Sequence, residues 1–244
     1  FLKESMLAKL VRQLYRMSIR KCYKVFFQNT GDRDYFIRHG MVKDNYDLLP
    51  GSGVNLSQHS LTELPGEEEI RFIYAGRVMA VKGIDEYLEC ARVIRELIPN
   101  TRFYIAGFTE EEKSKKMVEH YNAIKVVDYL GFQEDIDRWL RCCHCLILPS
   151  LGGEGVPNVL LEAAATGRPC IASDVNGSVD VVEDGVNGYI FRRGDAASLI
   201  EKTEQFLSLS HEEKRQMGLR GHEKVAREFD RKIVIDKYLR ELET

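Results

Sequence analysis

The sequence predicts an α/β fold in which helices cover both faces of a parallel, doubly wound sheet. Three observations lead to this prediction. Between residues 70 and 207, short apolar segments of strand length alternate with helical patterns. Several of these segments, such as Cys145–Leu148, are unbroken apolar runs, which is typical of strands buried on both faces. A glycine-rich loop, residues 151–157, follows one such segment, at the edge of the sheet where these folds bind ligands.

The first 56 residues predict a short α/β segment of their own. Residues 5–21 carry apolar side chains at helical spacing with basic residues between them. We interpret them as an amphipathic helix with a solvated basic face, and the alternative is a helix at an anionic lipid surface. A strand, a helix ending at Gly40 and a second strand are expected at residues 23–27, 32–39 and 46–49.

The rest of the chain divides into a linker, a main domain and a helical end. Residues 57–69 are polar and acidic and include Pro65 and Gly66, so we interpret them as a linker. The expected strands are residues 70–75, 102–106, 126–130, 145–148, 169–173 and 188–191. The expected helices are residues 84–97, 110–120, 136–141, 158–165, 179–182 and 196–207, with one or two more in 214–243. The resulting divisions are 1–56, 57–69, 70–221 and 222–244.

The composition argues against several classes of protein. The net charge is only −3 in 244 residues, so no global field would draw in nucleic acid or an anionic membrane. No apolar run is long enough for a transmembrane helix, and the start lacks the basic and apolar regions of a secretory signal. Because the chain begins with Phe1 rather than methionine, we interpret it as a processed or truncated piece of a longer protein.

The cysteines indicate a reduced, cytoplasmic protein. There are six, and a long chain without a secretory signal usually keeps such thiols reduced and buried. The cluster Cys142-Cys143-His144-Cys145 raises the alternative of a metal site. Zinc sites usually use two separated pairs of ligands, and no second pair is present. The cluster also leads directly into an apolar strand, so we interpret it as part of the core.

Two basic residues follow the strand expected at residues 70–75. Arg77 and Lys82 lie in the loop between Gly76 and a helix that begins near Ile84. The first turn of a helix carries positive potential, so this loop suits a phosphate group. The alternative is that both residues are ordinary surface charges.

The glycine-rich loop carries two acidic residues. Glu154 lies within the loop, and Glu162 lies about 7 Å along the helix that Pro157 opens. Two carboxylates so placed can accept hydroxyls at both ends of a long ligand. The alternative is that Glu154 only favours the helix start and that Glu162 faces solvent. Glu162, however, stands within an apolar run, where a lone acid is more often functional.

These segments resemble the family 4 glycosyltransferases, which are retaining enzymes of the GT-B type. Glu154 and Glu162, with seven residues between them, resemble the E-x7-E signature of that family. Gly76-Arg77 with Lys82-Gly83 resembles its diphosphate loop. Four more similar segments are the hinge at residues 50–55, Leu130-Gly131-Phe132 beside the base, Leu148-Pro149-Ser150 before the donor loop and the late turn at residues 183–189. The loop departs from the family at Val156, where many relatives have an aromatic residue, so the resemblance does not specify the sugar.

The resemblance implies a GT-B architecture. Residues 70–221 would form one Rossmann-like nucleotide-sugar-binding domain, and residues 1–56 would be the tail of a first Rossmann-like domain with its hinge. The acceptor-binding part of that first domain has no counterpart here. The helix within 222–244 would reach back to the first domain.

The resemblance also assigns roles to individual residues. Arg77 and Lys82 would meet the diphosphate of a nucleotide sugar, Glu154 the hydroxyls of the sugar and Glu162 those of the ribose. The expected catalytic residues are Arg77, Lys82 and Glu154. The expected donor-binding residues are Gly76, Arg77, Lys82, Leu130, Gly131, Glu154, Gly155, Val156, Pro157, Asn158 and Glu162. Neither a cofactor nor a metal is expected, because the two cations neutralise the leaving group and no aspartate-x-aspartate motif is present.

The implied activity is retaining transfer of a hexose from a nucleotide diphosphate sugar, with UDP favoured. The acceptor would be a glycan or a lipid-linked sugar, as in polysaccharide synthesis, with possible contact at the cytoplasmic face of the membrane. The partners would be the donor, the acceptor and the missing N-terminal domain, without which this piece binds donor but does not transfer. The alternative is a non-catalytic nucleotide-sugar-binding module. A dehydrogenase is disfavoured, because the pattern Gly51-Ser52-Gly53 has Leu56 where the third glycine would stand.

Overall fold

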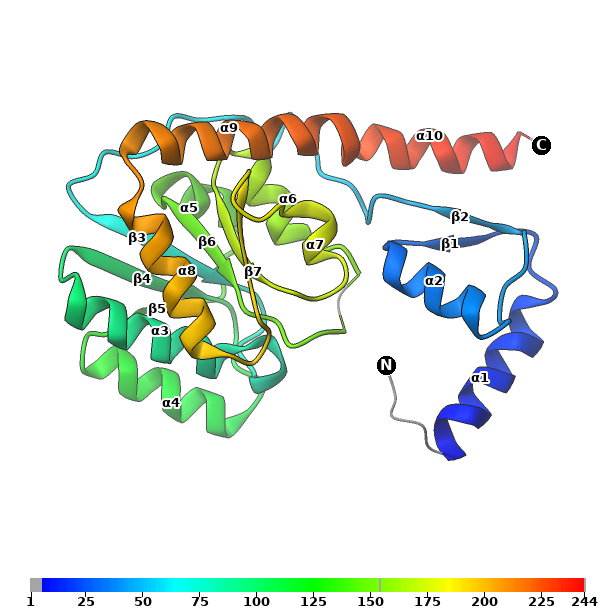
Figure 1. The fold of residues 1–244 in the computed structure, drawn as a ribbon, viewed down its shortest axis with the longest axis horizontal. Coiled ribbons are helices and arrows are strands. Elements are labelled where there is room, and N and C mark those ends of the chain that lie inside the picture. The colour runs from blue at the N-terminus through cyan, green and yellow to red at the C-terminus, as the bar shows by residue number, and fades with distance from the viewer. Residues whose placement is uncertain (1–5, 154, 244) are drawn as a thin grey trace.

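The structure is a computed structural model that describes residues 6–153 and 155–243, and its main body is a six-stranded parallel sheet (Figure 1). Its strands are β3 (Ile70–Ala75), β4 (Thr101–Ala106), β5 (Asp128–Gly131), β6 (Cys145–Leu148), β7 (Cys170–Ser173) and β8 (Gly188–Phe191). The spatial order is β5-β4-β3-β6-β7-β8, and all neighbours are parallel. The order reverses between β3 and β6, and ligands of such folds bind at that point.

Helices cover both faces of this sheet, as the sequence predicted. They are α3 (Ile84–Leu97), α4 (Glu112–Ala123), α5 (Ile136–Cys142), α6 (Asn158–Ala165), α7 (Ser178–Val181) and α8 (Ala196–Ser208), with a short 3-10 turn, η1 (Ala80–Lys82). Successive side chains of β3 enter opposite layers, because strand residues alternate between faces. Phe72 packs in a core with residues of α3, α4 and α8, whereas Ile73 packs in a core with residues of α5, α6 and α7.

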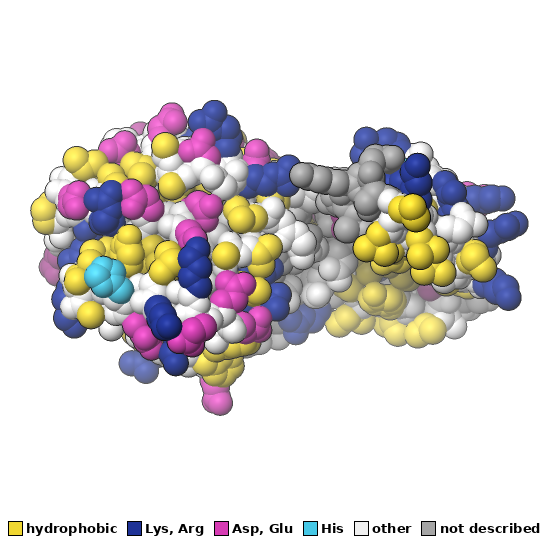
Figure 2. Space-filling view, turned by 90° about the horizontal axis from the view of Figure 1, so that it is seen from below, with side chains coloured by type: hydrophobic (Ala, Val, Ile, Leu, Met, Phe, Trp, Pro, Cys, Tyr) yellow, Lys and Arg dark blue, Asp and Glu magenta, His cyan; other side chains and the backbone are white. Residues whose placement is uncertain are grey.

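The N-terminal part is a small parallel sheet with two helices. Its elements are α1 (Met6–Ile19), β1 (Val25–Phe27), α2 (Thr30–Arg38) and β2 (Tyr46–Leu48). Helix α2 begins two residues earlier than expected, because the side chain of Asn29 accepts a hydrogen bond from the backbone N–H of Asp32 at 2.8 Å and caps the helix. The amphipathic segment forms a helix, α1, as predicted, but its side chains Leu7, Leu10 and Leu14 are exposed. Figure 2 shows apolar side chains gathered on this part, with lysines and arginines around them.

Two C-terminal helices run along both sheets. Helix α9 (His211–Glu228) packs on α6, and α10 (Arg231–Leu242) continues to the small sheet (Figure 1). The Nζ of Lys237 donates to the carbonyl of Leu48 at 2.6 Å, and the rings of Tyr238 and Phe26 lie 5.0 Å apart. Helices α9 and α10 are separated by a short break beside Val54. The N–H of Val54 donates to the carbonyl of Phe229, and the carbonyl of Val54 accepts from the N–H of Arg231.

Residues 57–69 contain no helix or strand, yet they are firmly attached to the main body. The buried guanidinium of Arg168 donates to the carbonyls of Thr62, Glu63 and Leu140. His59 is buried and pairs with Asp137, with 3.0 Å between Nδ1 and Oδ1. The division of the chain at residues 56, 69 and 221 stays a prediction.

Candidate site at the carboxyl edge of the parallel sheet

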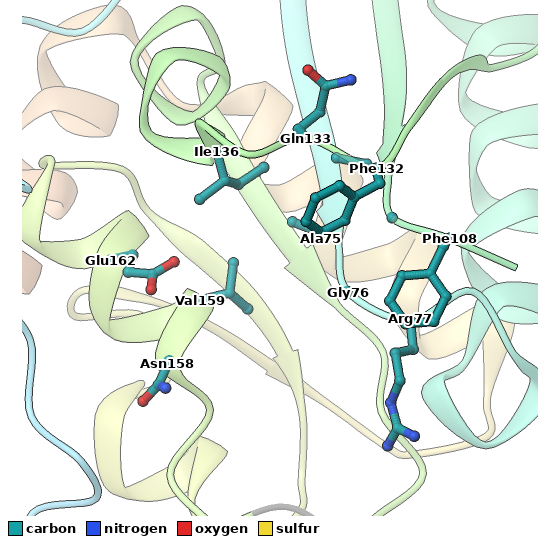
Figure 3. Close-up of a pocket in the computed structure, with 12 residues that line it drawn as sticks. Ala75, Gly76, Arg77, Phe108, Phe132, Gln133, Ile136, Asn158, Val159 and Glu162 are labelled. Atoms are coloured by element: carbon teal, nitrogen blue, oxygen red, sulfur yellow. The ribbon is translucent and has the colours of Figure 1, made fainter. Parts of the chain in front are cut away.

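A cavity of about 320 Å³ lies at the ends of β3, β4 and β5, against the start of α6 (Figure 3). Its lining consists of Ala75, Gly76, Arg77, Ala106, Gly107, Phe108, Phe132, Gln133, Ile136, Asn158, Val159 and Glu162. The structure thus brings together four residues that the sequence singled out in separate motifs, namely Gly76, Arg77, Asn158 and Glu162. The cavity lies beside the point where the strand order reverses, the usual place for a ligand in such a sheet.

Glu162 supplies the acidic group of this cavity. It lies on α6, and its carboxylate points toward the open space in Figure 3. Burial raises the pKa of the Glu162 carboxyl above its ordinary value, while the nearby His59 acts in the opposite direction and Asp137 adds to the rise. The carboxylate accepts no hydrogen bond from any residue that the structure describes, so its oxygens are open to a ligand.

Arg77 supplies the cationic group. The hydroxyl of Tyr74 donates to the carbonyl of Arg77 at 2.5 Å and fixes the backbone of the loop. The guanidinium is half exposed and lies 3.5 Å from the carboxylate of Glu110. An exposed ion pair of this kind contributes little to stability, so the guanidinium can turn toward an anion at small cost.

Lys82 ends η1 and does not line this cavity, but its loop is held against the glycine-rich loop. Gly83 has a φ of 75°, and a Cβ there would lie 1.9 Å from the carbonyl oxygen of Pro149. The N–H of Leu151 donates to the carbonyl of Val81 at 3.0 Å. The two motifs therefore form one continuous surface. The first turn of α3 carries Asp85 and Glu86, which weaken the positive potential expected at that helix start.

The glycine-rich loop is packed tightly from behind. Glu154 lies outside the described residues. No residue larger than glycine fits at Gly177, because a Cβ there would lie 1.6 Å from the carbonyl oxygen of Gly155. Val156 and Pro157 are buried rather than lining the cavity, and Val156 touches Gly51 of the hinge.

The start of α6 and the end of β5 place two further expected residues. Helix α6 starts at Asn158, with Pro157 one position before its first residue instead of within the first turn. Leu130 lies in β5, where its carbonyl accepts a hydrogen bond from the side chain of Gln133 at 2.6 Å, and Gly131 ends the strand. The residue that enters the cavity from this loop is the next one, Phe132.

Two aromatic residues of the cavity were not expected from the sequence. Phe108 is 46% exposed and Phe132 is 66% exposed, which is unusual for such large apolar side chains. Each directly follows a glycine, Gly107 after β4 and Gly131 at the end of β5. This repeated Gly-Phe pair at two strand ends is the signal that could have identified them.

The cysteine-histidine cluster belongs to the core except for Cys142, which is exposed, as is Cys22, so the expectation of buried thiols is wrong for these two. Cys143, His144 and Cys145 are buried, and both ring nitrogens of His144 bond to backbone groups, the N–H of Arg71 at 3.0 Å and the carbonyl of Gly66 at 3.1 Å. Burial lowers the pKa of His144 to about 4. Within residues 6–153 and 155–243, no three or more His, Cys, Asp or Glu side chains group in a way that could hold a metal ion. No helix in the same ranges is long and apolar enough to span a membrane.

The fold and the two loops at its carboxyl edge define a class of protein, the C-terminal domain of a GT-B glycosyltransferase. Anabaena HepE, solved in complex with UDP and glucose, matches with a TM-score of 0.81 at 17% identity, over 95% of this chain and 67% of that chain. The C-terminal domain of the group 1 glycosyl transferase LpcC from Francisella tularensis matches with a TM-score of 0.64 at 20% identity, over 73% of this chain and 99% of that domain. The chain belongs to the glycosyl transferases group 1 family, whose model matches residues 61–224.

Two of the curated relatives are named for transfer to a sugar linked to diphosphoundecaprenol. The N,N'-diacetylbacillosaminyl-diphospho-undecaprenol alpha-1,3-N-acetylgalactosaminyltransferase of Campylobacter jejuni is 24% identical over 98% of this chain. The UDP-Gal:alpha-D-GlcNAc-diphosphoundecaprenol alpha-1,3-galactosyltransferase of Escherichia coli is 34% identical over 53% of it. The chain spans 65% of the first relative and 34% of the second. Assignment to family 4 through Glu154 and Glu162 stays a prediction.

Proposed function

We propose that this chain is the donor-binding part of a retaining glycosyltransferase that transfers a hexose from a nucleotide diphosphate sugar. The observation that carries the proposal is the cavity at the carboxyl edge of the sheet that Arg77 and Glu162 both line. A cation suits the diphosphate of a nucleotide, and a carboxylate suits its ribose hydroxyls. UDP is the favoured nucleotide, and the UDP complex of Anabaena HepE supports that choice.

The nucleobase lies against the aromatic side of the cavity. Phe108 and Phe132 expose ring faces at its mouth, and stacking on such rings suits any base. Ile136 and Val159 continue the apolar lining toward Glu162. From the base, the ribose reaches Glu162, whose ionised form accepts its hydroxyls.

The diphosphate lies over the two loops that meet at Pro149. Arg77 and Lys82 offset its charge, and backbone groups between Gly155 and Asn158 follow the phosphate and the sugar. Glu154 holds the hydroxyls of the hexose. The developing negative charge on the leaving phosphate grows toward the transition state, so preorganised cations act most strongly there, without a metal ion.

Retention of the anomeric configuration follows if the acceptor attacks from the face that the phosphate leaves. The acceptor hydroxyl then passes its proton to the departing phosphate oxygen on that same face. A covalent intermediate on Glu154 is the alternative route to retention. The acceptor is a glycan or a lipid-linked sugar at the cytoplasmic face of the membrane, and a preceding domain that binds it completes the cleft.

Calorimetric titration of the chain with UDP, GDP and ADP tests the donor assignment. We expect UDP to bind, and to bind more weakly to Glu162→Gln while the exposed control Glu119→Gln binds it normally. If none of the three nucleotides binds the folded chain at millimolar concentration, the assignment is wrong. Transfer by the whole protein that persists after Glu162→Ala, or product with an inverted anomeric centre, would contradict the proposed reaction.

A further inference from the structure

His59 is a buried titratable residue near the donor cavity that the proposed function does not use. It belongs to the segment at residues 57–69, and it is only 5% exposed. It does not line the cavity, but Ile136, the residue before its partner Asp137, lines it together with Glu162. The histidine therefore lies behind the part of the cavity wall that α5 and α6 form.

Contacts of the ring and of its two neighbours in the chain hold His59 in place. Its Nδ1 lies 3.0 Å from the Oδ1 of Asp137, and because an ionised carboxylate only accepts, Nδ1 carries a proton. The guanidinium of Arg141 donates to the carbonyl of Gln58 at 3.4 Å and to the hydroxyl of Ser60 at 3.3 Å. The Nε2 of His59 makes no hydrogen bond with a residue that the structure describes, so this atom is left to take up a second proton.

The surroundings of His59 favour its positively charged form. Asp137 is bonded to the ring, and a carboxylate in this position stabilises the imidazolium. The other oxygen of Asp137 accepts from the Nε of Arg141, which keeps this carboxylate ionised and in place. Glu162, on the neighbouring helix α6, is a second carboxylate close enough to interact with the ring electrostatically.

Charged groups from three parts of the chain act on the carboxyl of Glu162. Burial raises the pKa of this carboxyl, His59 lowers it, Asp137 of α5 raises it and Arg231 of α10 lowers it. Arg231 is exposed, so water and salt screen its charge. His59 is buried, and its charge is screened much less. His59 is therefore the group that most opposes the protonation of Glu162.

We propose that His59 is a positioning residue of the donor site, whose positive charge keeps the Glu162 carboxylate ionised for the ribose hydroxyls. The inference rests on the proposed function and adds a residue that acts on the nucleotide only through Glu162. An ionised carboxylate accepts hydroxyls at both oxygens, whereas a protonated one has turned one oxygen into a donor. The alternative is a purely structural role, in which the histidine only attaches residues 57–69 to α5 through Asp137.

An NMR titration of the chain with ¹³C-labelled glutamate, without nucleotide, tests this proposal on Glu162 itself, whose signal is assigned by its loss in Glu162→Gln. His59→Asn keeps an N–H near the position of Nδ1 for Asp137, but it cannot carry a positive charge. We expect Glu162 to take up its proton at a higher pH in this variant than in the unchanged chain. Calorimetry over the same pH range should show that UDP affinity also falls at that higher pH. A purely structural role would leave both pH profiles unchanged.

The matched control is His120→Asn, the same substitution at an exposed position of α4 outside the cavity lining, and it should change neither profile. His59→Gln, which is also uncharged, is measured in parallel and should move the titration of Glu162 in the same direction as His59→Asn. A Glu162 titration that stays in place or moves to lower pH in either folded His59 variant would overturn the proposal. Failure of UDP to bind at any pH counts against the proposed function instead, because the titration of Glu162 is measured without nucleotide.

Discussion

The rings of Phe108 and Phe132 meet at the mouth of the donor cavity, with centroids 6.4 Å apart and planes inclined by 58°. Each ring stands one residue beyond a glycine at the end of a strand. Since β4 and β5 are paired, the two strand ends carry the rings to the same place. Neither ring is needed to fill the core, because both are largely exposed.

Replacing either ring should weaken the binding of UDP, and the loss should depend on the presence of the base. Phe108→Ala and Phe132→Ala are expected to raise the UDP dissociation constant, since stacking contributes about 1–3 kcal/mol per base. Calorimetry with pyrophosphate, which has no base, should give the same affinity for the variants and the unchanged chain. Ile124→Ala removes an exposed apolar side chain at the end of α4 and serves as the control. Equal losses for UDP and pyrophosphate would show that the rings do not contact the base.

Glu162→Gln should have opposite effects on stability and on binding. Burial raises the pKa of this carboxyl, so the folded protein holds its proton more tightly than the unfolded chain does. The resulting penalty on the charged form is absent below the ordinary pKa and grows as the pH rises through the raised one. At pH 7 the glutamine variant should therefore need more urea to unfold, yet bind UDP more weakly.

The same pKa shift predicts how binding depends on pH. UDP affinity should fall on acidification at a pH above that expected for an ordinary glutamate, because protonated Glu162 accepts fewer hydroxyls. The glutamine variant should lose this dependence. A variant that is both less stable and as tight for UDP as the unchanged chain would contradict the assignment of Glu162.

Gly83→Ala should disrupt the contact between the two loops of the donor site. The new Cβ would overlap the carbonyl of Pro149, and the backbone has a positive φ that alanine rarely adopts. We expect a loss of about 2–4 kcal/mol in the free energy of unfolding, and weaker binding of pyrophosphate. Gly66→Ala is the matched control, because a Cβ at that glycine meets no atom within 4 Å. Similar unfolding curves for the two variants would argue against this contact.

Arg168 does not line the donor cavity, and Arg168→Met should lower the free energy of unfolding of the chain. The substitution leaves the carbonyls of Thr62, Glu63 and Leu140 without their donor, at an expected cost of about 1–3 kcal/mol. Urea denaturation measures the loss, and Arg138→Met, on the exposed side of α5, provides the reference. Arg168→Lys should not restore stability, since one ammonium cannot reach three separated carbonyls. Full stability of that lysine variant would contradict this explanation.

Sugar transfer by the whole protein should continue in the presence of a chelator. Arg77 and Lys82 are proposed to offset the charge of the leaving diphosphate, so no divalent cation is required. Turnover measured with EDTA and with added Mn²⁺ should agree. Arg77→Ala should lower turnover more than it lowers donor affinity, because the charge that it meets grows in the transition state. Activity that EDTA abolishes would show that a metal is needed.

Much of the fold could be predicted because local patterns determine it. Helix α3 and strands β3, β6 and β8 have the bounds that apolar runs and helical spacing predict. The sequence singles out Arg77 and Glu162 because each belongs to a loop or helix that follows a strand, and their roles stay a prediction. That they share a cavity depends on β3 and β6 being neighbours, which the sequence pattern alone does not specify.

Other features depend on contacts that a linear pattern does not contain. The side chain of Asn29 extends α2, although asparagine there is equally typical of a turn. Phe108 follows a strand like many ordinary loop residues, and only the pairing of β4 with β5 gives it a partner. The polar segment at residues 57–69 is held in place by Arg168, a distant residue whose burial no periodicity indicates.

Two chain segments join the small sheet to the main body, and backbone hydrogen bonds connect them at Val54 and Arg231. Gly53 permits this approach, since a Cβ there would lie 2.6 Å from the Cα of Arg231. Both connections between the two parts pass through this crossing, so a rotation of one part against the other would pivot there. Because Lys237 ties α10 to Leu48, the helix and the small sheet would swing as one lever. Such a rotation would break the hydrogen bond between Thr30 and Asp180, which joins the small sheet's helix α2 to the main body.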